Sequence, residues 1–292
     1  GVRTQLSHVA PRPYAPRAET EAAFEAVERA RGDGHAVFVD TFPETWGPGN
    51  LADLFPPEIT QGRPAEVLAR LQDPRARRAV DEHFAAGRNF LVRAGGYEQI
   101  YVSSSPIRPE LTGRSLGELA REAGTSVGAW ACDALLEAGS LLMSVGIRHV
   151  YATEDDLDRV LALPYCGLGS DGVVTDGEGE ECRFPWNASS YGYAARTLER
   201  YVRERGLLTL EEAVRRLAAL PAEAMGLRDR GVLREGAAAD VVVLDPAQVH
   251  DRTTPADVAR HPEGIVHVLV NGVAVVEGGR ATHARPGVVL GR

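Results

Sequence analysis

The sequence contains no lysine, so all 32 of its basic side chains are arginines. A chain without lysine can form neither a Schiff base with a carbonyl substrate nor a carbamylated-lysine bridge between two metal ions. It also lacks the lysine that a phosphate-binding loop requires, although it has 31 glycines. These three chemistries are therefore excluded for this chain.

Cysteine is scarce, and long apolar runs are missing. Cys132, Cys166 and Cys182 are too scattered for a disulfide framework or a zinc knuckle, and they fit a reducing compartment, so we expect a cytoplasmic protein. No apolar run approaches the ~18 residues that a membrane span needs. The formal net charge of -9 disfavours contact with phosphate backbones. We therefore expect neither a membrane nor a nucleic acid as partner.

The first forty residues predict a strand–helix–strand unit of a parallel sheet. Val2–Ser7 and Ala36–Val39 read as strands, and apolar residues recur at helical spacing over Glu19–Arg31 between them. A third strand of this type is predicted at Tyr165–Ser170. The intervening chain predicts helices at 64–71, 74–86, 116–123, 127–138 and 154–163, the last capped by Thr153, and strands at 89–92 and 99–102.

The character of the sequence changes near residue 229. Two amphipathic helices are predicted before this point, at 194–205 and 210–220, and residues 177–190 read as a polar, glycine-rich loop over a site. After it, valine-rich strands are predicted at 241–244, 265–271 and 273–277. Asn271-Gly272 stands between two of them and indicates a tight hairpin. We therefore predict a small β module at 229–292.

Three of the predicted strands end in residues that can carry chemistry, namely His8, Asp40 and Asp171. In a parallel barrel, reactive side chains lie at the carboxyl ends of the strands. A neutral imidazole binds zinc, and a carboxylate beside the ion can deprotonate the attacking water and protonate the leaving amine. Together they suggest metal-assisted hydrolysis. Singly, each has a plainer role: a hydrogen-bonded histidine, a cap of the loop after Asp40, and a turn at Asp171-Gly172.

Several motifs resemble those of the D-aminoacylases, the N-acyl-D-amino-acid deacylases of the amidohydrolase superfamily. Ser7-His8, Asp40-Thr-Phe-Pro43 and Gly169-Ser-Asp-Gly172 occur in the order seen in that family. The closing segments of the chain also resemble the family's closing segments, at residues 201–207, 210–214, 227–231, 235–240, 244–246 and 264–272.

The resemblance implies an α/β fold, the C-terminal part of a metal-dependent (β/α)₈ TIM barrel plus a small β-sandwich module. Residues 1–228 would supply barrel strands 6 to 8, with a large insertion at about 44–164, and 229–292 would form the module. His8 would be a metal ligand, and Asp171 a metal neighbour and the general base, around one or two Zn²⁺. The implied substrate-binding residues are Phe42, Trp46, Tyr191 and Arg196.

The chain departs from the family pattern in informative places. The family's His-x-His pair, bridging cysteine and strand-5 histidine precede the region that this chain covers. Val9 and Ala10 stand where the family has a second histidine and a lysine. Residues 42–48 lack the hydroxyls with which the family holds a substrate carboxylate, and 187–189 read Asn-Ala-Ser in place of His-Pro-Arg. We still expect amide hydrolysis, but these departures leave open which substrate group next to the amide is recognised.

Half a barrel exposes two strand edges and cannot supply the three ligands of a catalytic zinc site. The chain begins at Gly1 without a methionine, which suggests a piece of something longer. We therefore expect the N-terminal half of the same enzyme as partner, either a separate chain or a product of one precursor. The assembly would hydrolyse the amide bond of an N-acyl amino acid, D-forms included, or of a peptide-like small molecule. The alternative is a non-catalytic amidohydrolase-like subunit that binds or scaffolds.

Overall fold

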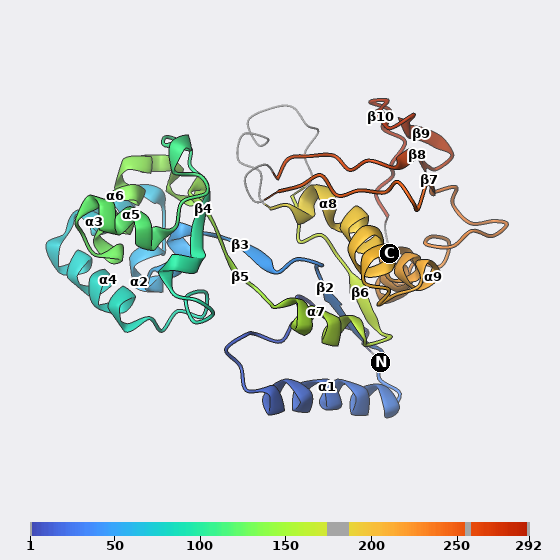
Figure 1. Cartoon of the computed structure of the whole chain (residues 1–292), viewed down its shortest axis with the longest axis horizontal. Helices are drawn as coiled ribbons and strands as arrows, with labels where there is room; N and C mark the ends of the chain where they lie inside the picture. Colours follow the sequence, from blue (N-terminus) through green and yellow to red (C-terminus); the bar gives the residue numbers. More distant parts are fainter. Residues whose placement is uncertain (1, 174–186, 255–257, 291–292) are drawn as a thin grey trace.

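The computed structural model describes residues 2–173, 187–254 and 258–290. Figure 1 shows two lobes joined by the strands β3 (Trp46–Asn50) and β5 (Gly146–Val150). One lobe holds the chain between these strands, and the other holds the segments before and after it. No helix within the described ranges combines the length and the apolar character that crossing a bilayer requires.

Short parallel strands form the centre of the second lobe, in the order β1-β2-β6. The elements are β1 (Thr4–Leu6), α1 (Arg17–Gly32), β2 (Val37–Thr41) and β6 (Cys166–Leu168). This arrangement confirms the predicted strand–helix–strand unit and its third strand. In β2, Phe38 and Val39 are buried, whereas every residue of β1 is exposed. The outer edge of β1 pairs with no other strand of the described chain.

Helices cover this sheet and share one apolar core with it. They are α7 (Glu154–Leu161), α8 (Ser189–Arg196) with its π-helical continuation Thr197–Glu204, α9 (Leu210–Val214), the π-helical Arg215–Ala219, and α10 (Leu220–Met225). Val39, Cys166 and Tyr201 lie in this core. The predicted cap is confirmed: Thr153 Oγ1 accepts a hydrogen bond from the Asp156 backbone N–H at 3.1 Å.

The other lobe has an apolar core of its own, built from residues between Leu51 and Ile147. Its helices are α2 (Pro57–Thr60), α3 (Pro64–Gln72), α4 (Pro74–Ala86), α5 (Leu116–Ala123) and α6 (Val127–Ala138). An antiparallel sheet β3-β5-β4, with β4 at Ile100–Ser104, lies beside them. The inserted chain therefore packs around an apolar core of its own. It leaves the second lobe through β3 and returns through β5, and neither strand belongs to the parallel sheet.

One sequence prediction in this lobe is wrong, and the strands β3 and β5 were not predicted. Asn89–Val92 forms turns and no strand, because the Asn89 side chain accepts a hydrogen bond from the Leu91 N–H at 2.9 Å and donates one to the Asp53 carbonyl at 2.8 Å. Such local side-chain bonding competes with strand pairing. Conversely, β3 was missed because Trp-Gly-Pro-Gly-Asn has little strand propensity.

The C-terminal segment forms an antiparallel sheet in the order β10-β9-β8-β7. Its strands are β7 (Val241–Leu244), β8 (Ile265–Val270), β9 (Val273–Glu277) and β10 (Arg280–Ala281). The predicted hairpin is confirmed: Asn271 and Gly272 both have positive φ, 49° and 81°, as a type I′ turn requires. Val242, Val243, Val266 and Val273 are exposed on this sheet.

The predicted loop at 177–190 falls mainly outside the described residues, which resume at 187. Its last two residues, Ser189 and Ser190, begin helix α8. Asn187 precedes that helix, and its side chain accepts hydrogen bonds from the backbone N–H and the hydroxyl of Ser190 at 2.7 and 3.0 Å. This local bonding fixes the start of α8 close to Asp171.

Candidate active site

The structure brings His8 and Asp171 together at the carboxyl ends of β1 and β6. His8 Nε2 lies 3.2 Å from Asp171 Oδ1. Both residues adopt the left-handed backbone conformation, with φ of 57° and 47°, two and three residues after the ends of their strands. Non-glycine residues seldom adopt it, and such strain clusters at functional sites. The pairing of these two predicted site residues is therefore a feature of the fold and not of the local sequence.

Asp40 holds the backbone and side chains around His8. Its carboxylate accepts hydrogen bonds from Gln5 Nε2 at 2.6 Å, Ser7 Oγ at 2.9 Å and the His8 N–H at 3.0 Å. The prediction that Asp40 caps the loop following it is wrong, because these bonds go to the neighbouring strand β1. Asp40 thus fixes the direction in which the chain leaves β1, and with it the position of the imidazole.

The Asp171 carboxyl lies in surroundings that favour its protonated form more than water does. Burial raises the pKa of Asp171, the nearby His8 lowers it, and the Asp40 charge raises it further. The net direction is upward, so the carboxylate is a stronger base than an exposed aspartate. Asn187 Nδ2 donates a hydrogen bond to the Asp171 carbonyl at 3.0 Å and fixes the backbone that carries the carboxyl.

Aromatic side chains pack next to the His8 imidazole. Phe42 lies edge-on to it with ring centroids 5.8 Å apart, and Tyr151 stacks on Phe42 at 4.2 Å. The Arg12 guanidinium lies 4.4 Å above the Tyr151 ring. Tyr151 and Asn187 are contributors that sequence reasoning missed. Tyr151 directly follows β5, so a correct prediction of that strand would have placed it at a strand end.

Two cavities meet at the His8–Asp171 pair. One of about 270 Å³ is lined by residues of β1, β2, β6 and α10, and the other of about 510 Å³ by residues of β3, β5 and the insertion lobe. Phe42, His8 and Asp171 border both cavities. A small substrate therefore has room on both sides of the pair.

A zinc ion fits this donor set in part. Imidazole nitrogen and carboxylate oxygen are ordinary zinc ligands, but a catalytic site uses three protein ligands. Within the described ranges, no three His, Cys, Asp or Glu side chains are grouped so that they can hold an ion. His8 and Asp171 can thus supply part of a metal site, and the rest must come from elsewhere.

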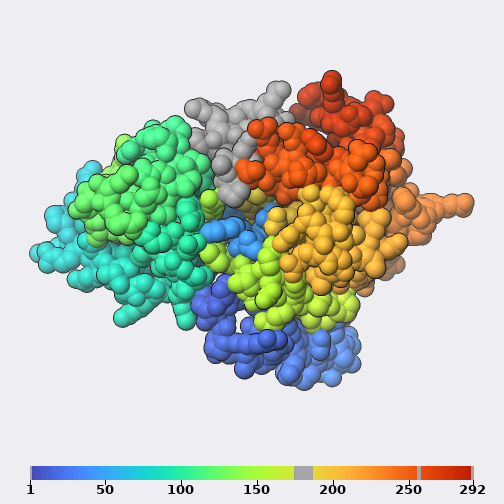
Figure 2. Space-filling model, viewed as in Figure 1, coloured from blue at the N-terminus to red at the C-terminus, as the bar shows by residue number. Residues whose placement is uncertain are grey.

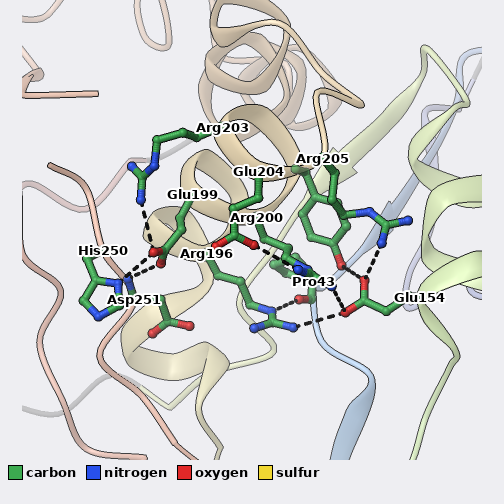
Figure 3. A network of polar contacts seen from close by, with 11 residues as sticks. Pro43, Glu154, Arg196, Glu199, Arg200, Arg203, Glu204, Arg205, His250 and Asp251 are labelled. Carbon is green, nitrogen blue, oxygen red and sulfur yellow. Dashed lines mark hydrogen bonds and ion pairs between the residues drawn. The ribbon is translucent and has the colours of Figure 1, made fainter. Parts of the chain in front are cut away.

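The predicted substrate-binding residues do not all gather at this pair. Phe42 contacts His8, as described above. Trp46 and Arg196 line a different cavity, of about 250 Å³, together with Glu44 and Arg148. Arg196 Nε donates a hydrogen bond to the Pro43 carbonyl at 2.6 Å, and Figure 3 shows its guanidinium between Pro43 and Glu154. Tyr191 lies edge-on to His261 at 5.7 Å.

Comparisons with known proteins agree with this geometry. A search with protein-family models matches residues 71–276 to the amidohydrolase family. N-acyl-D-glutamate deacylase of Alcaligenes xylosoxydans xylosoxydans is 37% identical over 237 residues, which make up 79% of this chain and 45% of that protein. D-aminoacylase of the same organism is 37% identical over 184 residues, 63% of this chain and 35% of that protein.

Solved structures show the same likeness. N-acyl-D-glutamate deacylase from Bordetella bronchiseptica, in complex with zinc and a phosphonate inhibitor, is 29% identical with a TM-score of 0.64, and the match covers 97% of this chain and 50% of that one. A D-aminoacylase studied for its binuclear metal centre is 26% identical with a TM-score of 0.68, covering 97% and 48%. The predicted fold class, a partial TIM barrel of this superfamily, is confirmed.

The chain spans about half the length of these relatives. The matching region includes most of the insertion lobe and the helices α7 to α10 that cover the parallel sheet. The resemblance read from the His8, Asp40 and Asp171 motifs is confirmed by relatives that are N-acyl-D-amino-acid deacylases. The chain belongs to the amidohydrolase family.

Proposed function

We propose that this chain supplies one part of the active site of a zinc-dependent amidohydrolase that hydrolyses the amide bond of an N-acyl amino acid. The observation that carries the proposal is the 3.2 Å approach of His8 Nε2 and Asp171 Oδ1 at the carboxyl ends of two barrel-type strands. The deacylase names of the relatives support the substrate class.

The side chains at the site have distinct roles in this proposal. His8 binds zinc through its imidazole, and Asp40 holds His8 in place through the hydrogen bonds described above. When bound, the ion supplies Lewis acidity and lowers the pKa of water. The Asp171 carboxylate takes a proton from the attacking water and passes it to the departing amine nitrogen. Burial raises the pKa of Asp171, which makes its carboxylate a stronger proton acceptor than an exposed aspartate. Phe42 packs edge-on against the imidazole.

We further propose that an N-terminal half of the enzyme, a separate chain or a product of one precursor, completes the barrel and the metal site. The open edge of β1 supports this, since an unpaired parallel strand exposes backbone N–H and C=O groups. The exposed valines of β7, β8 and β9 also support it, because an N-terminal half could bury them. In this proposal residues 1–228 belong to the barrel with its insertion, residues 229–292 belong to the sandwich, and the enzyme is cytoplasmic.

The test begins with the assembly as it exists. The chain is purified from its source cells through a C-terminal tag, and co-purifying chains are identified by mass spectrometry. Zinc content and hydrolysis of N-acetyl-D-amino acids and their L-forms are then measured. We expect a co-purifying chain, at least one zinc per assembly, and release of free amino acid.

The His8→Ala variant tests the metal role of the imidazole. We expect zinc content and activity to fall together, and more than the ~10- to 100-fold typical of residues that only orient a ligand. His35→Ala is the matched control, because His35 is exposed in the turn after α1. Unchanged zinc content in the His8 variant would contradict the proposal. An assembly without zinc or activity would favour the second candidate, a non-catalytic binding or scaffold subunit, which the absence of a third ligand in the described chain also supports.

A further inference from the structure

Arg148 is a partly buried arginine without a charged partner in the described part of the chain. It lies in the central strand β5, opposite Pro48 of β3 and Tyr101 of β4. Its Nε and Nη1 are shielded from solvent, and no hydrogen bond satisfies either atom. Within the described part of the chain no carboxylate forms an ion pair with Arg148. A buried cation without a partner is expensive, so its presence needs an explanation.

Aromatic rings hold the Arg148 guanidinium in place. Its central carbon lies 5.5 Å from the Trp46 ring centroid and 4.9 Å from that of Tyr101. Cation–π contacts use the faces of the planar group and leave its N–H edges for other partners. Burial lowers the pKa of Arg148, which shows that the surroundings do not fully compensate the charge. The guanidinium is thus oriented and still short of hydrogen-bond acceptors.

The neighbouring Arg196 provides an internal comparison. Its Nε donates to the Pro43 carbonyl, and its guanidinium pairs with Glu44 at 3.3 Å and with Glu154 at 3.7 Å. Figure 3 shows the Pro43 carbonyl and Glu154 beside the Arg196 guanidinium. Protein groups therefore satisfy Arg196, and Arg148 across the same cavity has no such partners.

The cavity that both arginines line has the size and chemistry of a small-ligand site. It measures about 250 Å³ and also includes Trp46, Ser103 and Asn187 in its wall. Figure 2 shows the blue segment that leads from β2 into β3 within a hollow between the two lobes. Glu44 also lines this cavity, but it is paired with Arg196, so Arg148 is the guanidinium left for an added acid. Arg148 suits a carboxylate, because arginine binds this planar anion through two parallel hydrogen bonds.

This cavity lies on the opposite face of the β3–β5 ribbon from the His8–Asp171 pair. Side chains alternate between the two faces of a strand. Trp46 and Arg148 line the Arg148 cavity, whereas His149 and Tyr151 line the larger cavity beside the pair; Gly47 and Pro48 of the ribbon border both. The two sites are therefore separate spaces.

We propose that the Arg148 cavity is a carboxylate-binding site, in which Arg148 anchors the acid group of a small organic acid. The site does not depend on the proposed hydrolytic function, because it is built from other residues and its test measures binding alone. The acid group belongs either to the carboxylate of the substrate or to a separate small acid, and the experiment distinguishes these sources.

The test uses isothermal titration of the purified assembly with sodium glutarate, and glutaramide serves as an uncharged probe of similar shape. We expect saturable binding of glutarate and none of glutaramide. Arg148→Met keeps the length of the side chain but removes the guanidinium, and should weaken glutarate binding at least ~10-fold, as loss of charge-assisted hydrogen bonds does. Arg29→Met is the control, because Arg29 is exposed on α1 and should leave the affinity unchanged.

The outcomes separate the possibilities. Equal affinity in the wild type and Arg148→Met, or no saturable binding by the wild type, overturns the proposal. Arg148→Met should retain the melting temperature of the unliganded wild type, since it removes an uncompensated buried charge. If it does not fold, Arg148→Lys replaces it: this variant keeps the charge but loses the planar fork, and unchanged glutarate affinity in it overturns the proposal. Glutarate that competes with N-acetyl-D-leucine identifies a substrate acid group, and glutarate that binds alongside it identifies a separate acid.

Discussion

Replacement of Glu44 by glutamine is expected to stabilise the protein at alkaline pH and to leave it almost unchanged in mild acid. The Glu44 side chain is only 12% exposed, and Oε2 pairs with Arg196 at 3.3 Å. Its other oxygen, Oε1, is buried without a hydrogen-bond partner. Burial raises the pKa of Glu44 from 4.5 to about 7, against the lowering effect of Arg196 and with further raising by Asp251 and Glu154.

The magnitude follows from the change in pKa. One pKa unit corresponds to about 1.4 kcal/mol, so the rise from 4.5 to about 7 corresponds to about 3 kcal/mol. Between these two values the folded protein keeps a proton that the unfolded chain has lost. Stability therefore falls as pH rises through this window, and the loss is complete above the folded pKa. Glutamine does not ionise, so the variant escapes this loss.

The assay is urea unfolding of the assembly, followed by circular dichroism at about pH 5 and about pH 8. We expect Glu44→Gln to exceed the wild type by about 3 kcal/mol at the higher pH and by less than about 1 kcal/mol at the lower. Glu235→Gln is the matched control, because Glu235 is exposed in the loop before β7. A difference that is the same at both pH values, or a less stable Glu44 variant at the higher pH, would refute the reasoning.

Three further predictions concern the pair, a helix cap and a helix contact. Asp171→Asn should lower turnover of the assembly ~10²- to 10⁴-fold with a smaller change in KM, and near-normal steady-state turnover would remove the carboxylate from the mechanism. Thr153→Ala removes the acceptor of the Asp156 N–H and should cost about 1 kcal/mol in urea unfolding, which Thr153→Ser should restore. Gly128→Ala would place a methyl group 3.0 Å from the Asp81 Cα, so α4 and α6 must move apart. Thermal melting should show a loss of about 1–3 kcal/mol in stability. An unchanged melting temperature would show that the two helices accommodate the methyl group without cost.

The sequence by itself determined the elements whose signals are local. Pro64 and Pro74 stand at the first positions of α3 and α4, and Ser115 and Ser126 cap α5 and α6 by accepting backbone hydrogen bonds. These helices were predicted at almost their observed bounds. The hairpin at Asn271 was predictable for the same reason, because both turn residues need a positive φ that asparagine and glycine tolerate. Such preferences depend on neighbouring residues alone.

The candidate site was predictable only as a set of separate strand ends. His8 and Asp171 were identified because each follows a buried-type strand and because the motifs around them resemble those of one family. The sequence could not show that the Asp40 carboxylate accepts hydrogen bonds from β1 and the residues after it, and not from the loop that follows Asp40. That depends on the parallel register of β1 and β2, which places the Asp40 carboxylate beside the end of β1.

Tertiary structure alone decided the rest. β3 is a strand because β5 offers it a partner along its whole length, and this pairing outweighs the poor strand propensity of its glycines and proline. Arg148 became notable only when Trp46 and Tyr101, from different strands, were seen to enclose it while no carboxylate of the described chain pairs with it. Contacts between residues far apart in the chain arise when whole helices and strands pack together. No local sequence pattern encodes which charged side chain this packing leaves without a partner.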